Sequence, residues 1–139
     1  MIEFLPATIE HAEAIRANLR DAQMRTMEKL GIDFDTLITK ALTQPAYTAL
    51  VDGVPAVMWG VYQETLLGDA KLWLLGTPLI EEHPVTFLRV SRDFVKRARL
   101  FFGPLNGMVD ADFIESVRWL EWLGFVRTGN GPYIPMRYN

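Results

Sequence analysis

The feature that most constrains the fold of this chain is the order of helix-like and strand-like hydrophobic spacing along its 139 residues. Apolar residues recur every three or four positions in some segments, and every second position or continuously in others. Glycine and proline stand at the junctions, for example at Gly31, Pro45 and Gly103. The predicted order is β-α-α-β-β-β-α-β-α-β-β. It indicates an α/β (α+β) fold with a mixed, mostly antiparallel sheet of about seven strands.

Each expected element has limits that the sequence suggests. Strands are expected at residues 2–5, 47–51, 54–62, 70–75, 105–109, about 125–128, and 133–138. Helices are expected at residues 9–30, with Thr8 as the cap at the start, and at residues 33–44, 84–102 and 110–125. Asp52-Gly53 accepts the positive φ angles of a tight hairpin turn between the second and third strands. No repeat or linker interrupts the chain, so one domain spanning residues 1–139 is expected.

The closing helix, Asp110 to Phe125, has the clearest pattern. Asp110 or Asp112 is expected to cap its start, and Gly124 is expected to end it in the left-handed conformation. The inward face comprises Phe113, Ser116, Val117, Leu120 and Leu123, and the outward face carries Glu115, Arg118 and Trp122. An outward tryptophan indicates a partner surface that would include Trp119, unless the last strands of the chain cover it.

The longest helix, residues 84–102, is predicted to separate two faces. Its apolar face is Phe87, Val90, Phe94, Ala98 and Phe101, and its basic stripe is Arg89, Arg92, Lys96 and Arg99. The stripe is either an ordinary solvated face or a contact for a phosphate-bearing ligand, for DNA or for an acidic protein.

Composition removes several function classes. The absence of cysteine excludes disulfides, thiol catalysis and cysteine-ligated zinc. Only His11 and His83 are present, so we expect no metal site and interpret both as surface or capping residues. The formal charge of −3 disfavours nucleic acid as a partner. No apolar run is long enough for a transmembrane segment, and no signal-peptide pattern begins the chain, so export by a signal peptide is not expected.

The element order, together with the segment Trp119-Leu120-Glu121-Trp122-Leu123-Gly124-Phe125, resembles the GNAT acyltransferase superfamily. In that family a penultimate helix often ends with an aliphatic residue, Tyr, two variable residues, an aliphatic residue, Gly and Phe. The Asp52-Gly53 hairpin, with Gly60 further along the third strand, is similar to the family's central meander. The resemblance implies an acyl-CoA groove in which the backbone of Leu74 and Gly76 would contact acetyl-CoA, if the protein is active.

Two family signatures are missing. The resemblance implies a glycine-rich diphosphate loop before the long helix, but residues 76–84 contain Pro78, Glu81, Glu82 and Pro84. Prolines lack N–H donors, and glutamates bring negative charge to the place of a diphosphate. The family's general-acid tyrosine corresponds to Leu120, so no catalytic residue is assigned. Glu64 and Asp69 are the acids nearest the central strands and are interpreted as loop residues.

A narrower resemblance is to the small GNAT-like internal virion proteins of short-tailed phages, through the segment Arg118 to Gly124 and the degenerate loop. It implies a non-catalytic virion, assembly or interaction module with no cofactor, located in the phage virion or the bacterial cytoplasm. A phage or host protein would be its partner, and a homo-oligomer is an open alternative. Two other hypotheses remain: an active acetyl-CoA-dependent N-acetyltransferase with a divergent loop, and a host-directed phage effector that binds a bacterial protein.

Overall fold

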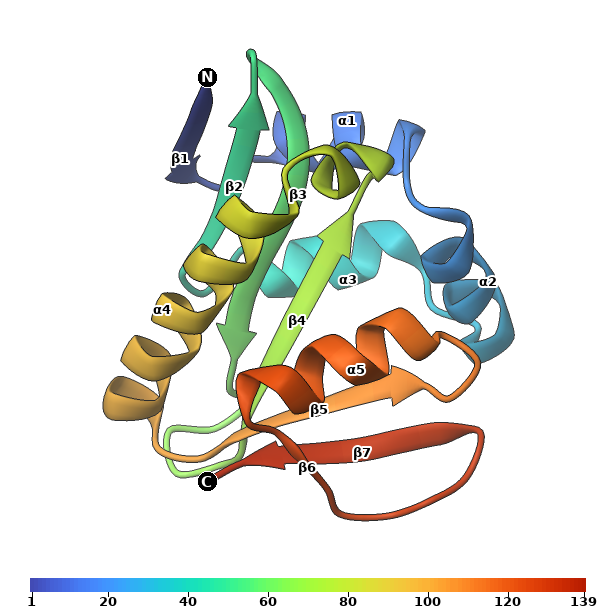
Figure 1. The fold of residues 1–139 in the computed structure, drawn as a ribbon, viewed down its shortest axis with the longest axis vertical. Helices are drawn as coiled ribbons and strands as arrows, with labels where there is room; N and C mark the ends of the chain where they lie inside the picture. Colours follow the sequence, from blue (N-terminus) through green and yellow to red (C-terminus); the bar gives the residue numbers. More distant parts are fainter. The chain divides into compact units, whose positions relative to one another are not determined.

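The computed structural model describes residues 1–139 and contains five α-helices, one short 3₁₀ helix and seven strands (Figure 1). The strands are β1 (Ile2–Pro6), β2 (Ala46–Val51), β3 (Val54–Tyr62), β4 (Ala70–Gly76), β5 (Leu105–Asp110), β6 (Val126–Arg127) and β7 (Tyr133–Tyr138). The helices are α1 (Ile9–Ala17), α2 (Asp21–Leu30), α3 (Phe34–Ala41), η1 (Pro78–Glu82), α4 (Pro84–Phe102) and α5 (Ile114–Leu123). None of these helices combines the length and the apolar character that crossing a membrane requires.

Hydrogen bonds join the strands in the order β1-β2-β3-β4-β5-β7-β6. β4 and β5 pair in parallel, whereas the pairs β1–β2, β2–β3, β5–β7 and β6–β7 are antiparallel. The predicted mixed, mostly antiparallel seven-stranded sheet is therefore confirmed.

Contacts divide the chain into two compact units, which are described separately below. The first unit comprises Met1–Tyr62 and Trp73–Pro84, and the second comprises Gln63–Leu72 and Val85–Asn139. Strand β4 thus contributes its last residues to the first unit and its first residues to the second. The expectation of a single domain stays a prediction.

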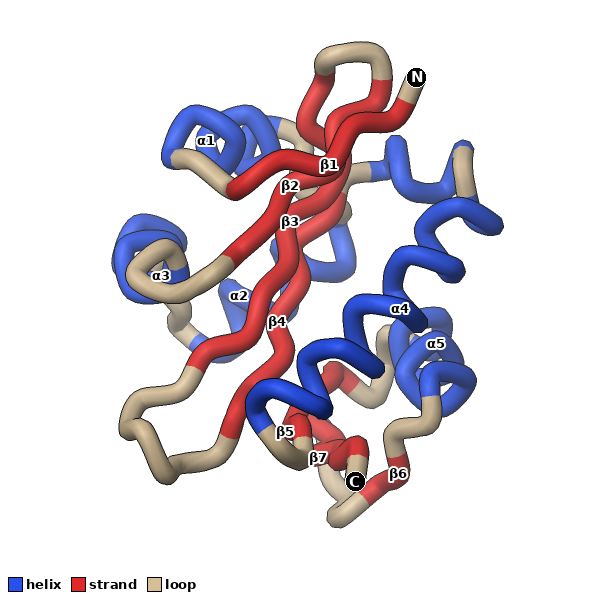
Figure 2. Tube along the Cα trace, turned by 90° about the vertical axis from the view of Figure 1, so that its left-hand side faces the viewer, coloured by secondary structure: helices blue, strands red, loops and turns tan.

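In the first unit, α1 and α3 cover one face of the antiparallel strands β1, β2 and β3 (Figure 2). Its buried core is made of Ala12, Ile15, Leu19, Phe34, Ile38, Met58 and Leu75. Thr8 and His11 form a capping box at the start of α1, so the predicted cap and the capping role of His11 are confirmed. Asp52 and Gly53 have φ angles of 48° and 82°, as the predicted hairpin turn requires.

The single helix predicted at residues 9–30 is wrong, because the chain forms two helices there, α1 and α2. The interruption is set by contacts distant in sequence. Leu19 turns into the core, where it is 8% exposed, and the N–H of the extended residue Arg20 donates to the Gly76 carbonyl over 3.1 Å. The bond to β4 therefore holds the segment between α1 and α2 in an extended conformation. No glycine or proline in the sequence marks this interruption of the helix.

In the second unit, α5 buries Val117, Leu120 and Leu123 and ends at Gly124 with φ 112°, as predicted. The predicted aspartate cap is wrong, because α5 starts at Ile114 and Phe113 occupies the cap position without a side-chain hydrogen bond. Asp110 is instead the last residue of β5, paired with Tyr133 of β7, and its side chain accepts from the Asp112 N–H over 2.9 Å. Sheet pairing fixes the backbone of Asp110 before the helix begins.

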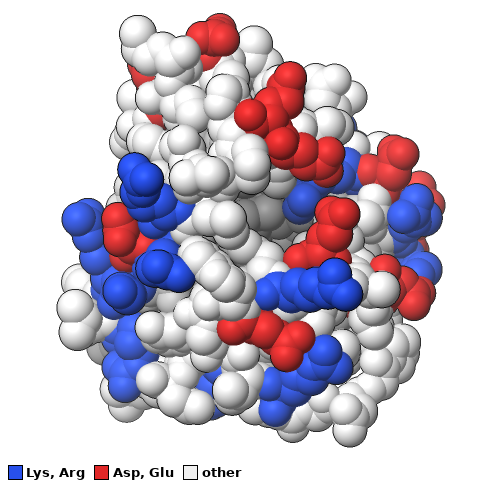
Figure 3. Space-filling view, viewed as in Figure 1, with Lys and Arg blue, Asp and Glu red and all other residues white.

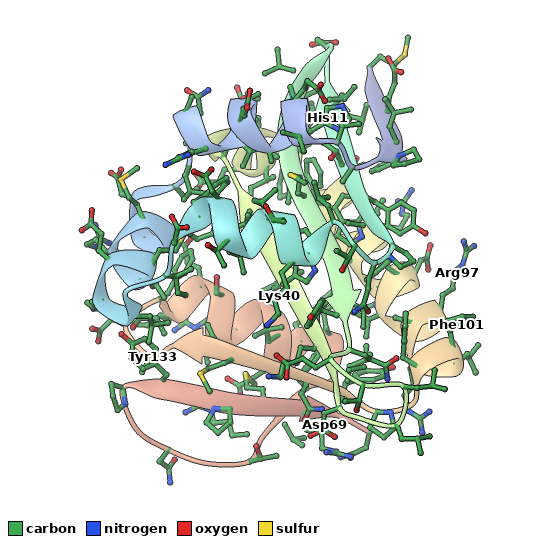
Figure 4. All side chains as sticks on the ribbon, turned by 180° about the vertical axis from the view of Figure 1, so that it is seen from behind. His11, Lys40, Asp69, Arg97, Phe101 and Tyr133 are labelled. Atoms are coloured by element: carbon green, nitrogen blue, oxygen red, sulfur yellow. The ribbon has the colours of Figure 1, made fainter.

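The faces of α4 follow the prediction except at Phe101 and Arg99. Val95 and Ala98 are its buried residues, whereas Phe101 is 82% exposed and points outward with Arg97 (Figure 4). Phe102 is half-buried instead and meets the Phe101 ring edge-on, at 4.8 Å between centroids. The helix has more apolar positions than one face can hold, so Phe101 was wrongly assigned to the packed face. Arg99 is half-buried rather than fully on the solvent side.

Candidate functional site

At its end in the first unit, strand β4 makes two hydrogen bonds with a side chain of α2, which the sequence did not indicate. The Gln23 side chain of α2 donates from Nε2 to the Leu74 carbonyl over 2.8 Å and accepts from the Gly76 N–H at Oε1 over 2.8 Å. These two backbone groups of Leu74 and Gly76 are called the β4 edge below. They belong to the backbone of the two residues that the resemblance nominated for acyl-CoA, and Gln23 binds both of them.

The alternating direction of backbone groups along β4 shows which way the two groups of the β4 edge point. Successive residues of a strand direct their backbone groups to opposite sides. The Thr77 N–H, one residue after Gly76, donates to Ala56 of β3 over 2.9 Å. The groups of Leu74 and Gly76 therefore point away from β3. In the second unit, the parallel ladder between β4 and β5 has two pairs, Ala70 with Leu105 and Lys71 with Asn106.

In the loop that follows β4, at residues 77–84, several N–H groups already donate to acceptors in the first unit. The Thr77 hydroxyl bonds the Ala56 carbonyl at 2.9 Å and caps η1 by accepting from the Leu79 N–H at 3.3 Å. The Ile80 N–H donates to the Thr77 carbonyl over 3.3 Å, and the His83 N–H donates to the Ile80 carbonyl over 3.4 Å. Pro78 and Pro84 have no N–H to offer.

The two glutamates of this loop are exposed. Glu81 and Glu82 lie in the last turn of η1, directly before His83 and the first residue of α4. Their carboxylates would repel a phosphate brought to this loop. The loop therefore has no glycine-rich turn, and four of its N–H groups already donate within the first unit.

Leu120, which the resemblance aligns with a general-acid tyrosine, is 7% exposed and belongs to the buried face of α5. Two tyrosines of the second unit have other neighbours. Tyr138 packs its ring against Phe125, with 5.5 Å between the ring centroids, and Tyr133 lies opposite Asp110 in the β5–β7 ladder. Glu64 and Asp69 are exposed in the loop before β4, as interpreted from the sequence. No group of three or more His, Asp or Glu side chains is arranged to hold a metal ion.

The second unit brings together residues of the two helices that the sequence nominated for partner contact. The Arg92 guanidinium of α4 lies over the Trp122 ring of α5, 4.1 Å from its centroid, and Trp122 is 46% exposed. Arg89 and Lys96 are also exposed on α4, and lysine and arginine side chains gather over this helix (Figure 3). Arg89, Arg92, Lys96 and Trp122 are called the α4–α5 surface below.

The other two nominated contact residues are less accessible. Trp119 and Arg99 are both half-buried, and the Nε atom of Arg99 is buried. The nominated residues thus divide into an exposed group around Arg92 and Trp122 and a less accessible pair. Gln23 was missed altogether, because a glutamine in a polar helix ordinarily faces solvent and nothing in its sequence neighbourhood points to β4.

Comparison with solved structures identifies the class of fold as that of the GNAT acetyltransferases. A GNAT-family acetyltransferase from Bacillus anthracis superimposes with a TM-score of 0.69 at 10% identity, covering 99% of this chain and 92% of the other. The PaiA N-acetyltransferase of Thermoplasma acidophilum, solved with coenzyme A, gives 0.69 at 13% identity and covers 100% and 99%. The Campylobacter jejuni N-acetyltransferase PseH, solved with acetyl coenzyme A, gives 0.61 at 11%, covering 100% and 99%.

These likenesses establish the fold alone, because the sequences share so few identical residues. No protein-family model matches the chain, and no curated protein matches its sequence. The GNAT resemblance seen in the element order and the closing helix is therefore confirmed at the level of fold.

Proposed function

We propose that this GNAT-fold chain is a protein-interaction module of a phage, acting in the virion or in its assembly, and that it does not transfer acetyl groups. The observation that carries the proposal is the loop at residues 77–84. Four of its N–H groups, those of Thr77, Leu79, Ile80 and His83, donate within the first unit, and two of its positions are proline. A diphosphate bound there would have to displace those bonds and face Glu81 and Glu82.

The chemistry of thioester cleavage gives a second argument. A departing thiolate needs a proton donor within hydrogen-bond reach, and a buried leucine side chain has no proton to give. Leu120 fills the core at the position where the resemblance implies that donor. Without this proton donor and without a diphosphate-binding loop, the fold is better suited to binding a protein partner than to acetyl transfer.

The α4–α5 surface is our candidate for that contact. Arginine and tryptophan are the residue types that most often dominate the energy of protein interfaces, and here they are stacked and exposed. The surrounding positive charge of Arg89 and Lys96 suits an acidic segment of a phage or host protein. The resemblance to internal virion proteins through Arg118 to Gly124 supports a phage protein as the partner, and the same surface would serve a homo-oligomer.

Two measurements test the proposal. Incubation with acetyl-CoA and a panel of primary amines should release no free CoA thiol above the rate without protein. Mass spectrometry of purified phage particles should detect the chain. Amine-dependent release of CoA would overturn the non-catalytic assignment, and absence of the chain from the particles would overturn the virion assignment.

The second candidate is an acetyl-CoA-dependent N-acetyltransferase with a divergent loop. It is favoured by the fold likeness to proteins solved with coenzyme A and with acetyl coenzyme A. In that case Leu74 and Gly76 would supply the backbone contacts to the cofactor. The thiol-release assay decides between the two candidates. A host-directed effector would instead be absent from particles and would bind a bacterial protein.

A further inference from the structure

Strand β1 has a neighbouring strand on one side only. It is the first strand in the order of the sheet, and it pairs with β2 alone (Figure 1). The Ala7 N–H, one residue after β1, donates to the Ala46 carbonyl of β2 over 2.9 Å. Because backbone groups alternate in direction along a strand, the odd-numbered residues of β1 bond to β2. The residues whose N–H and carbonyl groups point away from β2 are Ile2, Phe4 and Pro6.

The two edge strands of the sheet differ in length and in exposed side chains. At the other end of the strand order, β6 has two residues, and its Arg127 forms a 3.1 Å ion pair with Glu121. β1 has five residues, of which Phe4 and Leu5 are 45% and 37% exposed. Edge strands that avoid pairing with another chain are usually short, charged or bulged. β1 has no bulge in its pairing with β2 and so retains the features of an edge that accepts a strand.

An aromatic group lies beside this edge. The Phe4 ring meets the Trp59 ring edge-on, at 6.2 Å between centroids, and Tyr47 lies 6.1 Å from Trp59 on the same measure. Phe4 and Tyr47 are both exposed in part. A strand added to β1 would cover Phe4 and continue the apolar face that these rings begin.

One antiparallel register of two β1 strands satisfies outward backbone groups and keeps like charges apart. With Phe4 opposite Phe4 of a second copy, each Phe4 N–H meets the other Phe4 carbonyl, and each Ile2 N–H meets a Pro6 carbonyl. Glu3 then lies opposite Leu5. Sliding one strand by two residues in one direction places two Glu3 carboxylates opposite each other, which is destabilising. Sliding it in the other direction pairs Phe4 with Pro6, which has no N–H to donate.

We propose that two copies of this chain pair through β1, antiparallel and with Phe4 at the two-fold axis, so that one sheet runs through the dimer. The inference goes beyond the proposed function and involves none of the residues of the α4–α5 surface. A two-fold pairing occupies the outer side of β1 in both copies, so the assembly closes at the dimer. Each copy contributes one short strand, so the dimer belongs to the weak, transient class of interfaces.

Sedimentation velocity over a concentration series from about 1 to about 500 µM tests the pairing, because it covers the dissociation constants of weak dimers. The variants are Phe4→Ser, which removes the ring, and Phe4→Pro, which also removes the outward N–H. Proline is tolerated on an edge strand where the N–H faces solvent. The controls are Val126→Ser, at an exposed apolar position of β6, and Trp122→Ser, in the α4–α5 surface.

The wild type should change from monomer to dimer as its concentration rises. Phe4→Ser should raise the dissociation constant about tenfold, because two rings lose their contact across the axis. Phe4→Pro should stay monomeric over the whole series, since both hydrogen bonds between the Phe4 residues are lost as well. Val126→Ser and Trp122→Ser should dimerise as the wild type does.

Crosslinking locates the contact independently. The chain has no cysteine, so Glu3→Cys carries the only thiol. In the proposed register the two introduced thiols are diagonal neighbours across the strand pair, about 7–8 Å apart, within reach of a short bismaleimide. Glu3→Cys should therefore give a crosslinked dimer. Glu10→Cys, at an exposed position of α1, is the matched control and should not.

A wild type that stays monomeric throughout the series, or that grows beyond the dimer, would overturn the inference. Equal weakening by Phe4→Ser and Val126→Ser would also overturn it, as would equal crosslinking of the two cysteine variants. Loss of the dimer in Trp122→Ser alone would assign dimerisation to the α4–α5 surface instead. If Phe4→Pro loses its cooperative thermal unfolding, Phe4→Ser and the crosslinking decide.

Discussion

The guanidinium of Arg92 lies 4.1 Å from the centre of the Trp122 ring, which joins the basic stripe of α4 to the outward face of α5. This contact gives each side chain a neighbour while leaving Trp122 46% exposed. Stacking on arginine limits the rotamers of the tryptophan, so less conformational entropy is lost when a partner covers it.

Replacing Trp122 with serine should weaken partner contact much more than it weakens the fold. The free energy of unfolding should fall by about 1 kcal/mol, the scale of one partly exposed cation–π contact. Incorporation into particles, measured by mass spectrometry against the wild type, should fall severalfold. Phe101→Ser is the matched control, since Phe101 is exposed on α4 and lies outside the α4–α5 surface. An equal loss in both variants would contradict a specific role for Trp122.

A side chain at Gly60 should destabilise the first unit. A Cβ at this position would lie 2.9 Å from the Pro45 carbonyl oxygen and 3.1 Å from the Trp73 ring. Because the nearest atom is backbone, Gly60→Ala should lower the free energy of unfolding by about 1–3 kcal/mol, measured by urea denaturation.

Gly107→Ala is the control for this variant, since its Cβ would meet its nearest neighbour, Phe125, at an ordinary 3.9 Å. Similar losses in the two glycine variants would show that close approach to Pro45 is not what Gly60 provides.

Two helix-ending glycines should respond differently to asparagine. Gly31 has φ 64°, in the left-handed region that asparagine accepts, and a Cβ there would meet nothing within 4 Å. Gly124 has φ 112°, and a Cβ would meet the Tyr138 ring at 3.0 Å. Gly124→Asn should therefore lower the unfolding free energy by about 1–3 kcal/mol, and Gly31→Asn by less. Equal effects on the thermal unfolding midpoint would contradict this difference.

The cap of α3 should make stability depend on pH in the acid range. Hydrogen bonds from the Thr36 hydroxyl, at 2.6 Å, and from its N–H, at 3.3 Å, lower the pKa of Asp33 below its usual 3.8, with help from nearby Arg16. The stabilisation is fully present above that usual value, which applies to the unfolded chain, and is lost as the pH falls through the lowered pKa.

Asp33→Ala should accordingly reduce the unfolding midpoint at neutral pH, and its difference from the wild type should shrink below about pH 3.8. Glu13→Ala, at an exposed position of α1, is the control. A difference that stays constant as the pH is lowered would exclude the ionised cap as its cause.

Local signals in the sequence were sufficient for most of the fold. The Asp52-Gly53 turn, the stop at Gly124 and the capping box at Thr8 are all present, because each depends on residues within one turn of each other. The errors occur where distant contacts decide. The hydrogen bond from Arg20 to Gly76 interrupts the first predicted helix, and pairing with Tyr133 keeps Asp110 in a strand.

The candidate site was less predictable than the fold. The unusual loop and Leu120 could be read directly, because proline, glutamate and leucine have fixed chemical properties wherever they lie. The stack of Arg92 on Trp122 required the relative rotation of α4 and α5, although both residues were nominated separately. Gln23 reaches a strand about fifty residues away, and only tertiary structure brings that amide to Leu74 and Gly76.

Calorimetric titration of the wild-type protein with acetyl-CoA tests the central claim most directly. Four N–H groups of the loop at residues 77–84 already donate within the first unit, and Gln23 binds the β4 edge, so the account predicts no measurable heat and no shift in the thermal unfolding midpoint. Binding in the micromolar range would contradict it and would favour the acetyltransferase.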